Sequence, residues 1–143
     1  GKTGTLLPEL TSLAEELNIS DHVVFKENSS HSEVVRLMHS ATVFVLSSVR
    51  EGFPLVLLEA GYIELPIVTF NVGGVSELIS DNNGTLVNNR SIDSLSRAIQ
   101  DTLLNLPESK IKASRLKELI VNQHTWKGIV LQLTNLVVSY DNE

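Results

Sequence analysis

Residues 51–60 read Glu-Gly-Phe-Pro-Leu-Val-Leu-Leu-Glu-Ala, with two carboxylates, Glu51 and Glu59, eight positions apart. Pro54 suits the first position of a helix, because its φ is fixed and it has no N–H to leave unpaired there. The following residues are apolar almost all round, which predicts a helix over 54–63 that is buried on most of its surface. Burying an unpaired carboxylate is costly, so the two acids indicate a ligand that carries several hydroxyl groups.

The start of this helix would also attract an anion. The N–H groups of residues 52 to 55 and the helix dipole favour negative charge, such as that of a diphosphate. Glu51 would lie just before the helix, and Glu59 more than one turn inside it. A sugar, a diphosphate and a ribose could therefore lie along one line.

Strands and helices alternate along the chain. The predicted strands are residues 23–25, 42–46, 66–70 and 85–87. The predicted helices are 6–17, one that ends near Ser40 and is capped by Ser30 or Ser32, 75–80, one from the cap Ser91 to Leu104, 108–121 and 126–140. The strands are continuous apolar runs, which predicts an α/β fold with a Rossmann-like parallel sheet covered by helices on both faces.

Ligands bind such sheets at the carboxyl ends of the strands. Loops 26–31, 47–54 and 70–75 each follow a predicted strand, so we expect all three at one edge of the sheet. Topology therefore brings Glu51 and the glycine pair 73–74 together.

Further motifs follow in a fixed order around the two carboxylates. They are the strand Ala41–Ser48, the segment Leu65-Pro66-Ile67-Val68-Thr69, a Gly-Gly-x-x-Glu loop at 73–77, the turn and strand 82–87, and His124-Thr125-Trp126 with Tyr140. This ordered set, with its Glu-x7-Glu spacing, resembles the C-terminal, donor-binding domain of retaining glycosyltransferases of the GT-B fold, in particular family 4.

The resemblance implies a role for each carboxylate. Glu51 would be the catalytic residue that binds hydroxyls of the transferred sugar and positions it. Glu59 would bind the two ribose hydroxyls, because a carboxylate accepts two hydrogen bonds and so suits a diol. The donor sugar and phosphate would meet Gly52, Phe53, Pro54 and Leu55, and the nucleobase would meet the region of Phe25 and Lys26.

Each of these roles has a plainer alternative. Glu51 could be a solvated loop acid, and Glu59 could pair with Lys26 or with an arginine. The glycine pair 73–74 could shape the loop beside the donor site or form a purely structural turn. Glu77 could contact the substrate or stabilise the first turn of its own helix through the dipole.

Composition narrows the function classes. The 143 residues are predicted to form a single domain, residues 1–143, that binds a nucleotide-sugar. Cysteine is absent, and His22, His31, His39 and His124 have no metal-ligand spacing, so no metal and no cofactor is expected. A net charge of −6 argues against a nucleic-acid partner, and no apolar run approaches the ~20 residues that span a bilayer.

Compared with the family, the chain lacks the acceptor-binding N-terminal domain and the first two strands of the C-terminal domain. An Arg and Lys pair that neutralises the donor diphosphate follows the first of those strands. The missing strands would lie between 23–25 and 42–46, so we expect a gap or a rearranged edge in the sheet. We also expect this chain to be inactive alone.

The resemblance implies the donor-binding half of a retaining hexosyltransferase, with a UDP-sugar favoured over a GDP-sugar and an unspecified acceptor. It further implies a cytoplasmic enzyme of cell-envelope or polysaccharide biosynthesis, which could lie at the inner face of the membrane through the missing domain. The alternatives are a nucleotide-sugar epimerase of the GT-B type and a non-catalytic sugar-nucleotide-binding or scaffold domain.

Overall fold

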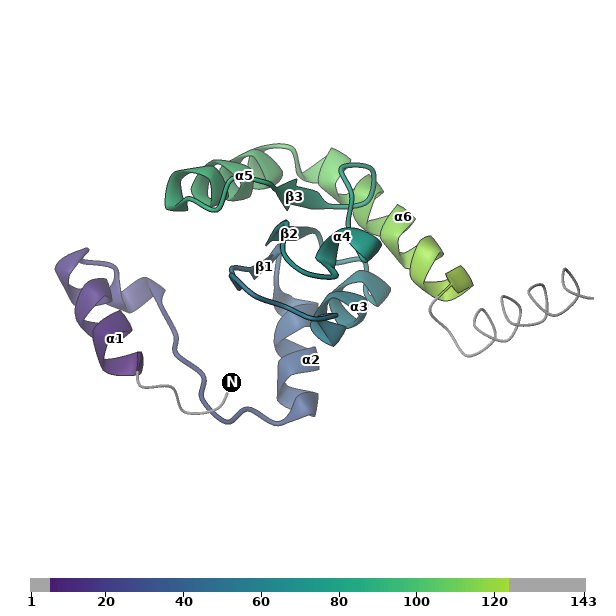
Figure 1. The fold of residues 1–143 in the computed structure, drawn as a ribbon. Helices are drawn as coiled ribbons and strands as arrows, with labels where there is room; N and C mark the ends of the chain where they lie inside the picture. The colour runs from purple at the N-terminus through teal and green to yellow at the C-terminus, as the bar shows by residue number, and fades with distance from the viewer. Residues whose placement is uncertain (1–5, 124–143) are drawn as a thin grey trace, which may run out of the picture. The chain divides into compact units, whose positions relative to one another are not determined.

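The computed structural model describes residues 6–123 (Figure 1). The predicted helix 126–140 and the motif residues His124 to Trp126 and Tyr140 lie outside the described residues. The chain divides into two compact units, with the boundary between Leu37 and Met38. That the units together form one domain stays a prediction.

The first unit confirms its two predicted helices. It holds α1 (Leu7–Glu16), the short 3-10 helix η1 (Ser20–His22) and most of α2 (His31–Ser40). Of the two candidate caps of α2, Ser30 is the one used, because its Oγ accepts a hydrogen bond from the Glu33 N–H at 3.3 Å.

The strand predicted for residues 23–25 is wrong. The backbone of Val23 is extended, with φ −119° and ψ 126°, but the segment pairs with no described strand. Val24 is 76% exposed and Phe25 is 38% exposed. β-Branched and aromatic residues favour extended backbone, yet a strand also needs a neighbour that takes its hydrogen bonds. None of the described strands pairs with this segment, so the apolar run stays irregular.

The second unit is built on three parallel strands, β1 (Phe44–Leu46), β2 (Ile67–Phe70) and β3 (Thr85–Val87), with β2 in the middle. Val45 pairs with Val68, and Val68 pairs with Thr85. Every residue of β2 is buried, as the continuous apolar run predicts. Among the described strands β1 pairs with β2 alone. The gap expected between 23–25 and 42–46 is not tested as predicted, because residues 23–25 form no strand.

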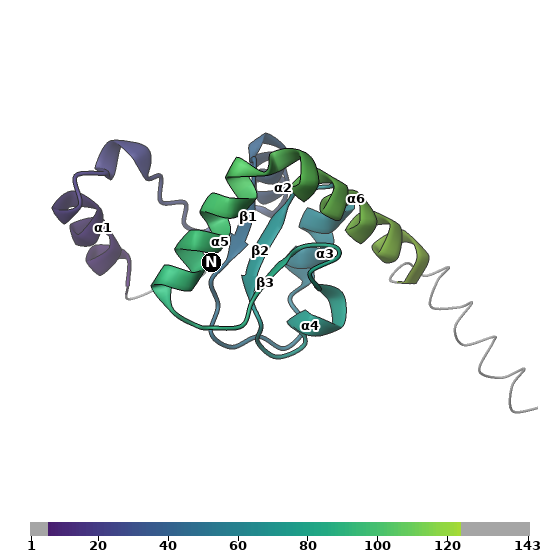
Figure 2. The same ribbon diagram turned by 90° about the horizontal axis from the view of Figure 1, so that it is seen from above.

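Helices cover both faces of this sheet, which confirms the predicted α/β fold. In Figure 2, α5 (Ile92–Leu104) lies on one face and α3 (Leu55–Tyr62) on the other. The long helix α6 (Leu106–Gln123) contacts α3 and α5, and the one-turn helix α4 (Val75–Leu78) follows β2. Ser91 caps α5 as predicted, its hydroxyl accepting a hydrogen bond from the Ser94 N–H.

The buried amide of Asn83 holds the turn between α4 and β3. This side chain is 6% exposed. Its Oδ1 accepts a hydrogen bond from the Ser80 N–H at 2.7 Å, and its Nδ2 donates to the Leu78 carbonyl at 3.0 Å. Both polar ends are therefore paired, as a buried amide requires.

Replacing Asn83 by Ala is expected to lower the free energy of unfolding by about 1–3 kcal/mol, because the buried Leu78 carbonyl and the part-buried Ser80 N–H lose their partner. Urea denaturation of the two proteins measures the change. Asn82→Ala is the matched control, since Asn82 is exposed and its side chain is expected to contribute less than about 0.5 kcal/mol. Equal losses for the two variants would contradict a holding role for Asn83.

A side-chain cluster ties the end of α3 to α6. Glu64 has φ +59°, a left-handed conformation that is uncommon outside glycine. Its carboxylate accepts hydrogen bonds from Lys117 and, at 2.8 Å, from the Ser114 hydroxyl. The hydrogen bond from Lys117, with that from Ser114, holds the pKa of Glu64 below its usual value. Glu64 therefore joins the end of α3 to α6, two elements that are far apart in sequence.

Candidate functional site

Two of the three predicted loops meet at the carboxyl edge of the sheet. The loop after β1 leads to α3, and the loop after β2 leads to α4. They are joined by a hydrogen bond in which the Gly74 N–H donates to the Gly52 carbonyl at 2.8 Å. Parallel strands place both loops at one edge, so the predicted convergence of Glu51 with the glycine pair 73–74 is confirmed.

The third loop, residues 26–31, follows no strand and belongs to the first unit. Residues 23–25 form no strand, so the strand that was expected to lead this loop to the edge of the sheet is not there. Within that unit, the Lys26 ammonium lies 3.5 Å from the Glu33 carboxylate, and Phe25 is partly exposed. A nucleobase contact for Phe25 and Lys26 stays a prediction.

Pro54 is the N-cap residue of α3 and not its first helical residue. Its φ of −77° is the value that the ring imposes, but its ψ of 103° is extended. Proline fixes φ alone, so the helix begins one residue later, at Leu55. The side chain of Pro54 is buried, and its carbonyl accepts a hydrogen bond from the Leu57 N–H at 3.0 Å.

The burial of α3 is less complete than predicted. Leu57, Ala60 and Gly61 are buried, because they face the sheet and α6. Leu55 is 65% exposed and Tyr62 is 56% exposed. An apolar sequence all round therefore does not by itself bury a helix, because a covering element must lie against each side.

The two carboxylates take the positions that the spacing predicts. Glu51 lies in the loop ahead of α3, and Glu59 is the fifth residue of the helix. Both are half-buried. The rise of an α-helix places Glu59 about 6 Å along the axis from Leu55. The first-turn amides of α3 and its positive dipole end lie between the two acids, where they could bind an anion.

The glycine pair lies directly on the backbone of the first carboxylate. Gly73 has φ +51°, and a Cβ built there would lie 1.8 Å from the Glu51 carbonyl oxygen. A Cβ on Gly74 would lie 2.6 Å from the Gly52 carbonyl oxygen. Real Cβ atoms do not approach backbone oxygens so closely, so these positions require glycine.

One polar pair at this edge was not found from the sequence. The Asn71 Nδ2 donates to the Asn88 Oδ1 at 2.8 Å, and the Asn71 N–H donates to the Val87 carbonyl at 2.9 Å. These bonds fix the end of β2 to the end of β3. The signal that could have found them is an asparagine placed directly after each of two apolar strands.

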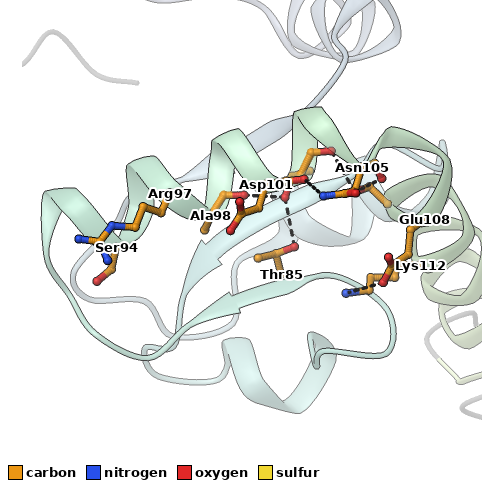
Figure 3. Close-up of a pocket in the computed structure, with 10 residues that line it drawn as sticks. Thr85, Ser94, Arg97, Ala98, Asp101, Asn105, Glu108 and Lys112 are labelled. Carbon is orange, nitrogen blue, oxygen red and sulfur yellow. Dashed lines mark hydrogen bonds and ion pairs between the residues drawn. The ribbon is translucent and has the colours of Figure 1, made fainter.

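A separate hollow of about 350 Å³ lies between α5, the start of α6 and Thr85 (Figure 3). Thr85 is the first residue of β3, so this hollow is at the amino edge, away from Glu51. Its charges are mixed, with Arg97 and Lys112 beside Asp101 and Glu108. The Thr85 and Thr102 hydroxyls lie 3.3 Å apart within it.

Residues 6–123 contain no cluster of three or more His, Asp or Glu residues able to hold a metal ion. None of the helices in this part of the chain combines the length and the apolar character that crossing a bilayer demands.

The chain is similar to proteins of a known family. Residues 3–119 match the family model of glycosyl transferases group 1. A protein of Haemophilus influenzae described as an uncharacterized glycosyltransferase is 33% identical over 130 residues, which is 85% of this chain and 36% of that protein. The chain thus spans about a third of the length of this curated relative.

Solved structures share the fold. Sucrose-phosphate synthase of Thermosynechococcus elongatus superposes with a TM-score of 0.77 and 26% identity, over 94% of this chain and 34% of that chain. HepE of Anabaena, solved in complex with UDP-glucose, gives a TM-score of 0.79 at 21% identity, over 93% of this chain and 36% of that chain. The GT-B fold, the motif order and the match over residues 3–119 agree, and the chain belongs to the glycosyl transferases group 1 family.

Proposed function

We propose that this chain forms the donor-binding part of a retaining glycosyltransferase of family 4 type, which transfers a hexose from a nucleotide-sugar to an acceptor. One observation carries the proposal. Two half-buried carboxylates, Glu51 and Glu59, flank the N-terminus of α3 at the carboxyl edge of a parallel sheet. A nucleotide-sugar has hydroxyls at both ends and a diphosphate between them, in the same order as these groups.

Each part of the site has a task in this proposal. Glu51 binds hydroxyls of the hexose and positions it, and Glu59 binds the ribose diol. The diphosphate, which gains negative charge as the bond to the sugar breaks, lies at the amides that open α3. The reaction is proposed to need no metal, and a basic pair outside this chain completes the neutralisation of the phosphates.

The remaining partner is an acceptor-binding domain of the same protein, because the chain spans only about a third of its relative. The cleft between the two domains would exclude water and bring the acceptor to the sugar. Holding the two reactants together in this way supplies much of the rate enhancement of such a reaction. A UDP-sugar is the first choice of donor, and a GDP-sugar is the second.

The nucleotide is expected to lose affinity when Glu59 is replaced by Ala. A hydrogen bond to a charged group is worth about 1.5–3 kcal/mol, so we expect the dissociation constant of UDP or GDP to rise roughly 10-fold to 100-fold. Titration calorimetry on the full-length protein measures it.

The 2′-deoxy nucleotides make this test specific. The unchanged protein should bind the 2′-deoxy nucleotides more weakly than it binds UDP and GDP. The Glu59→Ala variant should bind the deoxy and the parent nucleotides equally well, because the carboxylate that would contact the 2′-hydroxyl is gone. A penalty for the missing 2′-hydroxyl that persists in Glu59→Ala would exclude Glu59 as the ribose ligand. Absence of nucleotide binding by the folded full-length protein would overturn the proposed function.

A further inference from the structure

The backbone of residues 51–52 rests on the loop of residues 71–74, the glycine loop, which joins β2 to α4. The Gly74 N–H holds the Gly52 carbonyl at 2.8 Å, and the space at Gly73 is so small that a Cβ would overlap the Glu51 carbonyl oxygen. Gly52 itself is not crowded, because a Cβ built on it would meet no atom within 4 Å. Residues 51–52 are therefore supported by the glycine loop and open in the direction of that Cβ.

This contact fixes more than one carbonyl. The peptide group is planar, so a hydrogen bond to the Gly52 oxygen sets the orientation of the whole plane that links residues 52 and 53. Gly73 leaves no room beside the preceding carbonyl, that of Glu51, so this carbonyl cannot move toward the loop if residue 73 carries a side chain. Glu51 follows β1 in the chain and directly precedes the peptide group that the hydrogen bond holds. The atoms nearest to a Cβ on Gly73 and on Gly74 are the carbonyl oxygens of Glu51 and Gly52. These are backbone atoms, which cannot rotate away as a side chain could.

We propose that Gly73 and Gly74 are positioning residues for Glu51, and that they determine the rate of sugar transfer rather than the affinity for the nucleotide. The inference rests on the proposed function and assigns to the glycine loop a task within that site. Glu59 is supported differently, because it lies on α3, which packs on β2 and α6. A shift of the 51–52 backbone would therefore displace the sugar-binding carboxylate. Glu59 and the amides of α3 from Leu55 onward, which are proposed to bind the ribose and the diphosphate, would stay in place.

Gly74→Ala tests the inference in the full-length protein. Gly74 has φ −77°, which alanine adopts freely, so the added Cβ at 2.6 Å from the Gly52 oxygen is the whole perturbation. Misplacement of a reacting group by about 1 Å can cost about 100-fold in rate. We expect kcat for hydrolysis or transfer of UDP-glucose or GDP-mannose to fall roughly 100-fold. The dissociation constant of UDP or GDP should change by less than about threefold.

Gly84→Ala is the matched control. Gly84 is buried, and its Cβ would lie 2.8 Å from the Ile79 side chain, but it precedes β3 at the opposite edge of the sheet. This variant should lower the thermal midpoint and keep kcat. A role of Gly74 in stability alone predicts the same behaviour for both variants.

Asn71→Ala is a milder variant for the case that Gly74→Ala does not fold. It removes the exposed hydrogen bond to Asn88 that fixes the start of the glycine loop to β3. We expect a smaller fall in kcat, on the order of fivefold, again with nucleotide affinity kept. Asn88→Ala removes the same bond from the other side, and the double variant should be no slower than either single one.

The outcomes separate the two proposals. An unchanged protein that neither binds a nucleotide nor turns over UDP-glucose or GDP-mannose would overturn the proposed function and this inference with it. An active protein in which folded Gly74→Ala and Asn71→Ala keep kcat would overturn the inference alone. So would a parallel loss of kcat and nucleotide affinity, since the glycine loop would then support the whole site and not Glu51.

Discussion

Glu51→Gln is expected to lower the turnover of the nucleotide-sugar by roughly 100-fold to 1,000-fold, the cost of removing one preorganised polar group from a transition state. Glutamine keeps the length of the side chain and one acceptor oxygen. It loses the negative charge and replaces the second acceptor with a donor. Since Glu51 is proposed to bind hydroxyls of the sugar, the nucleotide alone should still bind.

The measurement is a comparison of kcat and of UDP or GDP affinity in the full-length protein. Asp81→Asn is the matched control, because Asp81 is an exposed acid in the turn before β3, at the amino edge of the sheet. It should keep full turnover. A Glu51→Gln protein with unchanged kcat would show that Glu51 is a solvated loop acid, which is its plainer interpretation.

Leu116→Ala is expected to lower the free energy of unfolding by about 2–5 kcal/mol, the cost of emptying a fully buried leucine site. Leu116 lies in α6 and is 0% exposed. It packs on Gly61 of α3, where a built Cβ would lie 2.7 Å from the Leu116 Cδ2 and 2.6 Å from the Ile120 Cδ1. Gly61 thus lets the two helices approach closely.

The same contact predicts how a second variant behaves. Gly61→Ala alone should cost about 1–3 kcal/mol, because its methyl group overfills the interface. In the double variant the methyl occupies space that Leu116 has vacated, so the combined loss should fall short of the sum by about 0.5–3 kcal/mol. Denaturation of the four proteins measures this coupling.

Ile111→Ala is the control for this pair of variants. Ile111 also lies on α6 but is 54% exposed, so its truncation should cost less than about 0.5 kcal/mol. Additive losses for Gly61→Ala and Leu116→Ala would show that the close approach of α3 to α6 is not made at these residues.

The local signals of the sequence predicted most of the second unit. The cap at Ser91, the turn around Asn83 and the buried apolar run of β2 each depend on a few neighbouring residues, and all three are confirmed. The boundary at Pro54 was displaced by one residue, because proline restricts φ and leaves ψ to the surroundings. Site positions followed from the strand–loop–helix order, but the ligand roles of those residues stay predictions.

The failures concern partners distant in sequence. Residues 23–25 have the composition of a strand and no described neighbour to pair with. The contacts of Glu64 with Lys117 and Ser114, which lie about fifty positions away, were likewise not predicted. The sequence offered no signal for these contacts, because the charged residues that could pair with Glu64 are many.

The sequence by itself determined the class of the fold, the order of its elements and the two carboxylates at the ends of the motif. These follow from residue spacing and from backbone preferences that act within a few residues. Only the tertiary structure brought Gly73 and Gly74 against the backbone of Glu51 and Gly52. Because glycine tolerates many conformations, the sequence does not say why it occurs at these positions. In the folded chain the backbone of Glu51 and Gly52 comes so close that a Cβ at residue 73 or 74 would overlap it.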